Sequence, residues 1–164
     1  MSSNTHIQGL NRLIEVCLDG DLGYRTAARH LHSSKLRTIF TDYAIRRSQF
    51  AEELRAEVER LGGIPTATGS AAASLHRGWI ALKSDVSGGD AGAIVAACEA
   101  GEHSALASYQ ATIHEVFLAD FPAAFPSHTR ALIEKQRQAI EEAHHRIRGI
   151  KDEIASGVEY SAND

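Results

Sequence analysis

The sequence is poor in several features that define common classes of protein. Two of its 164 residues are cysteines, Cys17 and Cys98, and no Cys-x-x-Cys pair occurs. A zinc knuckle or a redox-active pair is therefore unsupported, and we interpret both cysteines as reduced, buried side chains. The sequence also has no run of 18 apolar residues that could cross a membrane as a helix.

An excess of positive charge is also missing. Lys and Arg number 17 against 21 Asp and Glu, which gives a formal net charge of −4. General nucleic-acid binders neutralise phosphates with a surplus of Lys and Arg on one surface, so neither nucleic acid nor a membrane is an expected partner. The first residues are polar and lack the charged-then-apolar pattern of a secretory signal, so we expect a cytoplasmic protein.

Familiar catalytic motifs are absent as well. The sequence contains no glycine-rich phosphate loop, no Gly-x-Ser-x-Gly, and no Cys/His pair in a context suited to nucleophilic catalysis. The residues therefore favour a protein without enzymatic activity over an enzyme.

What the sequence does contain is helical periodicity. Apolar residues recur at i, i+3, i+4 and i+7 in four segments, and this spacing predicts long helices over residues 5–31, 36–61, 91–118 and 127–156. At 1.5 Å per residue each would be roughly 40 Å long. The prediction is one all-α domain over residues 1–164, with a core over about residues 5–156 and a frayed tail over residues 157–164.

The connections between these segments predict the topology. Gly62, Gly63 and Pro65 end the second helix, because glycine takes a left-handed cap and proline cannot continue it. A long connection over residues 66–89, with a short helix expected over about residues 75–82, then has room to cross the bundle. Such a crossover would make the third helix parallel to the second, as in ferritin-type bundles. Trp79 lies in this crossover, and we expect it to pack on the bundle or to contribute to a dimer contact.

Two glycines interrupt the middle of the first predicted helix. Gly20 and Gly23 each weaken a helix by about 1 kcal/mol relative to alanine. Such residues are easier to understand where a neighbouring helix or a ligand approaches closely.

Several stretches resemble an uncharacterised bacterial family of ferritin-like four-helix-bundle proteins, named only as a domain of unknown function. The resemblance spans about residues 5–154. It implies a ferritin-like four-helix bundle with one long crossover more than it implies an activity. The stretches that carry it are residues 10–15, 19–20, 23–24, 46–54, 75–79, 98–102 and 143–148.

The resemblance raises the question of a metal site. A di-iron bundle takes one Glu from each of two helices and a Glu-x-x-His pair from each of the other two. Here the last helix offers Glu141 and His144, and the third offers Glu102. The second helix has Arg47 where similar proteins begin their Glu-x-x-His, and a guanidinium stays protonated and has no lone pair for a metal.

Two main hypotheses follow. In the first, Arg47 forms a central polar network with Asp21, Glu102 or both, joined by Gln136 or His144, because a buried cation must be paired. Glu15 and Asp19 are less plausible first-helix partners than Asp21. No cofactor is then expected, and self-association into a dimer through helix faces or the crossover is the expected partnership.

The second hypothesis keeps a metal. A reduced site on Glu102, Glu141 and His144 would bind iron or manganese and serve an oxidative-stress role. A third possibility is that Glu141 and His144 belong only to a solvated helix face.

Overall fold

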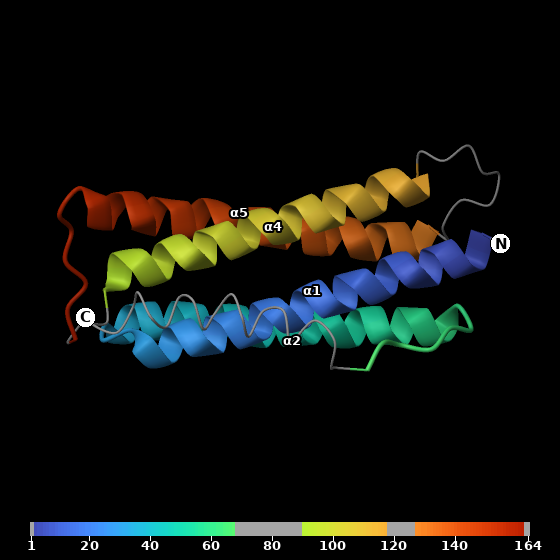
Figure 1. Cartoon of the computed structure of the whole chain (residues 1–164), viewed down its shortest axis with the longest axis horizontal. Coiled ribbons are helices and arrows are strands. Elements are labelled where there is room, and N and C mark those ends of the chain that lie inside the picture. Colours follow the sequence, from blue (N-terminus) through green and yellow to red (C-terminus); the bar gives the residue numbers. More distant parts are fainter. Residues whose placement is uncertain (1, 68–89, 118–126, 163–164) are drawn as a thin grey trace.

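The computed structural model describes residues 2–67, 90–117 and 127–162. These residues form four long helices: α1 (Ser2–His30), α2 (Ser34–Arg60), α4 (Ala91–Phe117) and α5 (Ser127–Ala155) (Figure 1). Strands are absent from the described ranges. The predicted helices are confirmed, with bounds correct to within one turn. The predicted short crossover helix and Trp79 lie outside the described residues.

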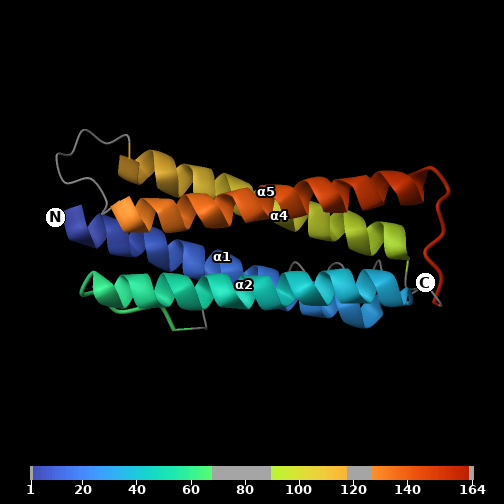
Figure 2. The same ribbon diagram turned by 180° about the vertical axis from the view of Figure 1, so that it is seen from behind.

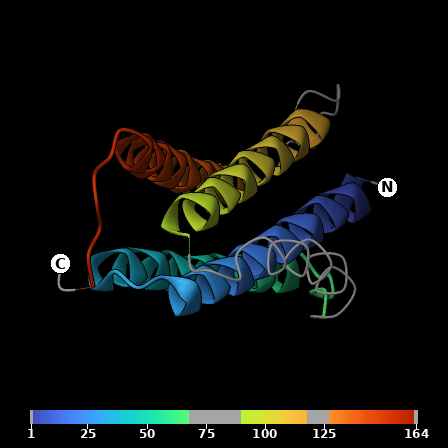
Figure 3. The same cartoon turned by 60° about the vertical axis from the view of Figure 1, so that its left-hand side comes forward.

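The helices form a four-helix bundle of two antiparallel pairs. α1 and α2 make one pair and α4 and α5 the other, and α1 also packs along α4 (Figures 1 and 2). Turning the molecule shows the pairs as two layers (Figure 3). α2 and α4 run in the same direction, as the predicted crossover requires. None of the described helices is long and apolar enough to cross a membrane.

Local signals in the sequence explain where the helices begin and end. Ser33 caps α2 through its side-chain oxygen, which accepts a hydrogen bond from the backbone N–H of Leu36 at 3.3 Å. Asp90 does the same for α4, accepting from the N–H of Gly92 at 2.9 Å. Gly62 follows α2 with a φ of +77°, the left-handed conformation that favours glycine.

The apolar core is divided into two clusters along the bundle. One contains Tyr24, Phe40 and Tyr43, whose rings pack with centroids 5.4 to 6.4 Å apart. The other contains residues nearer the opposite ends of the same helices, including Leu13 and Leu54. On α2 the first cluster ends at residue 44 and the second begins at residue 50, so residues 45–49 lie at the boundary. A layer of polar side chains fills this middle level.

The segment after α5, predicted as a frayed tail, crosses the end of the bundle as far as residue 162 (Figure 1). Gly157, with a φ of +93°, turns the chain out of the helix. Tyr160 then packs against the first apolar cluster, and its hydroxyl donates a hydrogen bond to Glu153. The ammonium of Lys35, at the start of α2, lies 5.4 Å from the ring centroid of Tyr160.

Candidate functional site

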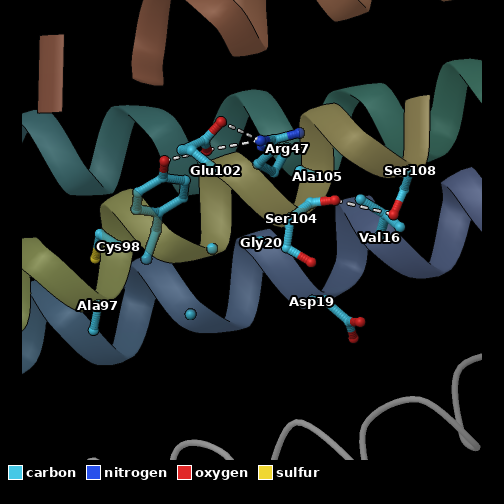
Figure 4. A pocket seen from close by; sticks show the side chains of 13 residues that line it. Val16, Asp19, Gly20, Arg47, Ala97, Cys98, Glu102, Ser104, Ala105 and Ser108 are labelled. Atoms are coloured by element: carbon cyan, nitrogen blue, oxygen red, sulfur yellow. Dashed lines mark hydrogen bonds and ion pairs between the residues drawn. The ribbon is translucent and has the colours of Figure 1, made fainter. Parts of the chain in front are cut away.

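A buried ion pair occupies the middle of the bundle. Arg47 projects from α2 and is 3% exposed, and Glu102 projects from α4 and is 2% exposed. Nη2 of Arg47 donates to both carboxylate oxygens of Glu102, at 2.7 Å to Oε1 and 2.6 Å to Oε2 (Figure 4). The pair therefore joins two parallel helices across the interior.

A tyrosine from α1 completes the pair. The hydroxyl of Tyr24 donates a hydrogen bond to Oε1 of Glu102, so this carboxylate receives donors from two other helices. Burial raises the pKa of Tyr24, and the charge of Glu102 raises it further, so the phenol stays a neutral donor. Burial alone would lower the pKa of Arg47, but the adjacent Glu102 raises it instead, and the guanidinium stays charged.

Space for the arginine comes from a glycine on α1. A Cβ placed on Gly20 would lie 3.1 Å from Cγ and 3.2 Å from Nε of Arg47, which is tighter than ordinary van der Waals contact. The prediction that a neighbour approaches closely at Gly20 is confirmed, and the neighbour is the side-chain stem of Arg47. A residue that weakens α1 thus allows a long cationic side chain to enter the interior.

A second set of hydrogen bonds continues from this level. The thiol of Cys17 lies 3.2 Å from the hydroxyl of Tyr109, and that hydroxyl donates to Oε1 of Gln136 at 2.7 Å. Nε2 of Gln136 in turn donates to Glu53 at 2.8 Å. Burial raises the pKa of Cys17 despite the opposing charge of Arg47, so the thiol stays protonated. Gln136, expected to join the Arg47 network, is therefore buried but bonds to Tyr109 and Glu53 and not to the Arg47–Glu102 pair.

Asp21, the first-helix partner predicted for Arg47, lies elsewhere. Its Oδ1 accepts a hydrogen bond from Nε of Arg25 at 2.6 Å, one helical turn along α1. This pair is partly solvated, which avoids the cost of burying a second carboxylate beside a single arginine. Tyr24 supplies the α1 contact to the central pair in its place.

His144 also takes no part in the central pair. The interior face of α5 passes through Ala143 and Ile147, so the next residue, His144, lies at the border of that face. Its Nε2 is 3.6 Å from Oε1 of Glu99, a residue whose other oxygen accepts from Lys151 at 2.5 Å.

The three predicted metal ligands are not brought together. Glu102 is engaged by Arg47 and Tyr24, whereas Glu141 accepts a hydrogen bond from Arg137 at 3.1 Å. His144 pairs with Glu99, as described above. Across residues 2–67, 90–117 and 127–162, no group of three or more His, Cys, Asp or Glu side chains is arranged to hold a metal ion.

Sequence reasoning also missed a polar cluster near the far end of α2. Glu57 is 3% exposed and accepts hydrogen bonds from Arg60 at 2.8 and 2.6 Å. The hydroxyl of Thr129, in the first turn of α5, donates to the same carboxylate. Hydrogen bonds from Arg60 lower the pKa of Glu57, although burial opposes them. The sequence does indicate that Glu57 is buried, because it follows Leu54 by three residues and so falls on the buried face of α2.

A pocket of about 140 Å³ opens beside the central pair, between α1 and α4. Its lining residues are mostly small, and they include Gly20, Arg47, Cys98, Gly101 and Glu102. In the view of Figure 4 the carboxylate of Asp19, another lining residue, points away from the Arg47–Glu102 pair.

Asp19 is held in an unfavourable environment for a carboxylate. Partial burial and the neighbouring charge of Glu15 raise the pKa of Asp19 from 3.8 to about 6. Its charged form is therefore less stable in the folded protein than in the unfolded chain.

These features define an all-α four-helix bundle whose centre is a buried arginine–carboxylate pair. Residues 5–115, more than half of the sequence, match the model of the family described as "Domain of unknown function (DUF2383)". The chain belongs to this family. No curated protein matches the sequence.

The buried pair predicts strong coupling between its two members. Arg47→Met and Glu102→Gln should each lower the free energy of unfolding by about 3–5 kcal/mol, because each leaves the remaining charge without its main partner. The double variant should lose clearly less than the sum of the two single losses. Urea unfolding followed by circular dichroism measures these differences.

The matched control is Arg137→Met, which removes a partly exposed arginine that bridges Glu134 and Glu141 on α5. It should cost at most about 1 kcal/mol. Losses that simply add in the Arg47/Glu102 double variant would contradict a coupled buried pair.

Asp19 predicts a pH dependence. Between its ordinary pKa of 3.8 and its folded value of about 6, the folded state binds more protons than the unfolded state. The protonated carboxyl of Asp19 therefore makes its full contribution to the free energy of unfolding below pH 3.8. That contribution is lost as the pH rises through about 6. Asp19→Asn should flatten this part of the stability curve and raise the melting temperature at neutral pH. An unchanged slope in thermal unfolding over this window would contradict the assignment.

Proposed function

We propose that this protein is a non-catalytic, ferritin-like bundle in which an arginine–carboxylate cluster occupies the place of a di-iron centre. Its role would be structural or ligand-binding. The observation that carries the proposal is the contact of Arg47 with both oxygens of the Glu102 carboxylate, at 2.7 and 2.6 Å, in a site where each residue is at most 3% exposed.

The chemistry of this contact argues against a metal at the same place. A guanidinium offers no lone pair, and its charge repels a cation. The carboxylate of Glu102 already receives hydrogen bonds from Arg47 and Tyr24, so a metal ion would have to displace both donors. The parallel directions of α2 and α4 support the ferritin-like part of the proposal, because a crossover between the second and third long helices is typical of those bundles (Figure 1).

The alternative is a metal-binding bundle with fewer ligands. Glu99 and His144 lie 3.6 Å apart near the surface, and the ring of His103 is centred 6.0 Å from that of His144. Histidine and carboxylate side chains near a surface can take up metal weakly from solution even though they form no three-ligand group among the described residues, and such binding has no relation to the centre of the bundle. A test of function must therefore separate central from peripheral binding.

Metal analysis makes this separation. The purified protein is incubated with iron(II), manganese(II) or zinc(II), passed through a desalting column and analysed by plasma mass spectrometry. We expect well under one ion per chain, and we expect any residual metal to be lost in Glu99→Ala, because it would reside at the surface. One ion per chain that is lost in Glu102→Ala and retained in Glu99→Ala would overturn the proposal.

We also propose that the protein is cytoplasmic and self-associates through the outer face of α1 and α2. Leu22 and Ile45 support this surface, since they are 41% and 44% exposed. Both residues lie at the same level of the antiparallel pair, between the Gly20–Arg47 contact and the Tyr24–Tyr43 contact.

Light scattering should give the mass of a dimer for the parent protein, and the mass of a monomer for Ile45→Glu. A monomeric parent protein would refute this surface.

A further inference from the structure

The pocket between α1 and α4 has a carboxylate at its rim that no cation balances. Asp19 lines this pocket and is half-buried. Burial and the neighbouring charge of Glu15 both raise the pKa of Asp19, and no cation of the described residues lowers it. Two residues further along α1, Asp21 is paired with Arg25, whereas no Lys, Arg or His in the described part of the chain forms an ion pair with Asp19. The position therefore favours a positively charged partner.

Glu15 adds to the negative charge at this rim. It lies one helical turn before Asp19 on α1, and like charges at this spacing repel each other. Oε1 of Glu15 accepts a hydrogen bond from the hydroxyl of Thr66 at 3.3 Å, and a hydroxyl carries no positive charge that could balance a carboxylate. Two carboxyl groups thus lie together on this side of α1.

The titratable groups at the inner end of the pocket leave this balance unchanged. Arg47 and Glu102 neutralise each other, with Nη2 2.6 Å from Oε2, and both are buried. Burial raises the pKa of the Cys98 thiol and of the Tyr24 phenol, so each of these groups stays neutral. The pocket therefore has a neutral inner wall and a negative rim, which selects a cation over an anion.

The remaining wall of the pocket suits an apolar group of about one ring. The volume of about 140 Å³ is close to the roughly 150 Å³ of an apolar cavity that accepts benzene. Val16, Ala97 and Ala105 line the pocket beside three glycines, so much of the wall is apolar side chain or bare backbone. In Figure 4 the carboxylate of Asp19 points away from the central ion pair, which places the charge of a ligand at the rim and its apolar part inside.

We propose that this pocket binds a small organic cation, a primary ammonium with an apolar group of about one ring, whose ammonium pairs with the carboxylate of Asp19. The apolar part of the ligand lies between α1 and α4. The proposal names a ligand for the non-catalytic bundle and rests on that proposed function, because the inner wall is neutral only while Arg47 stays paired with Glu102. The charge of Glu15 adds to the attraction.

Benzylamine, benzyl alcohol and benzoate form a matched set of probes, since they share a ring and differ in charge. A primary amine is protonated at neutral pH, as a lysine side chain is. Chemical-shift changes in ¹H–¹⁵N spectra, recorded during titration of the metal-free protein, measure binding of each probe. We expect benzylamine to bind at least about tenfold more tightly than the other two, with the largest shifts at residues that line the pocket. Equal affinity for benzylamine and benzyl alcohol, or tighter binding of benzoate, would overturn the proposal.

The pH dependence of binding tests the role of Asp19. Below its pKa of about 6 this carboxyl is mostly protonated and attracts an ammonium only weakly. The affinity for benzylamine should therefore rise about tenfold between about pH 5 and about pH 7.5, in proportion to the ionised fraction, while that for benzyl alcohol stays constant. An affinity for benzylamine that does not change over this range contradicts the pairing.

A substitution at the carboxylate tests the same contact. Asp19→Asn keeps the size of the side chain and removes its charge, so it should abolish both the preference for benzylamine over benzyl alcohol and the pH dependence. The control is Asp42→Asn, which removes an exposed carboxylate of α2 and should change neither. A preference for benzylamine that persists in Asp19→Asn would refute the assignment.

A blocking variant tests the location. Gly101 lines the pocket, and a Cβ added to it meets no atom within 4 Å, so Gly101→Leu can fold with its side chain occupying open space. We expect it to weaken benzylamine binding by at least about tenfold. The control is Gly149→Leu, on the exposed side of α5, where an added Cβ also meets nothing within 4 Å. Benzylamine binding that survives in Gly101→Leu would place the site elsewhere.

Metal content measured on the same samples separates this proposal from the proposed function. A protein that is free of metal and does not bind benzylamine contradicts the ligand alone. A metal ion that is lost in Glu102→Ala contradicts both, because the neutral inner wall requires the Arg47–Glu102 pair.

Discussion

The contact between Arg47 and Glu102 fixes how the helices of this bundle are aligned. The pair joins α2 to α4, and Tyr24 brings α1 to the same carboxylate. Sliding either helix by one turn, about 5.4 Å, would leave two charges in the interior without partners. Buried ion pairs add little net stability. The main effect of this pair is therefore to allow only one alignment of the helices. The apolar clusters on either side can then pack in one register only.

Much of the fold could be predicted from the sequence because it depends on local signals. The spacing of apolar residues located all four helices, and Gly62 marked where the second one ends. Arg47 and Glu102 could be placed in the interior for the same reason, since each interrupts an otherwise apolar face. Helical periodicity says which face a residue occupies, and this information suffices to put both charges inside.

The partners within the site were harder to predict, because periodicity does not say which residues meet across helices. Asp21 shares the inward stripe of α1 in the sequence, yet a cation one turn away holds it at the surface. Tyr24 lies at an apolar position of α1, yet its hydroxyl donates to Glu102. A tyrosine has an apolar ring and a polar hydroxyl. The relative positions of α1 and α4 along the bundle decide whether the hydroxyl finds a buried partner.

The glycine that admits Arg47 has a consequence for motion. Gly20 and Gly23 lie within one turn of each other, and both line the pocket. Glycine has low helix propensity, so the stretch of α1 that covers the ion pair is also its intrinsically least stable stretch. Transient opening of a helix begins where its local stability is lowest. Local opening of α1 is therefore expected to begin at the level of the buried charges, before either apolar cluster is disturbed.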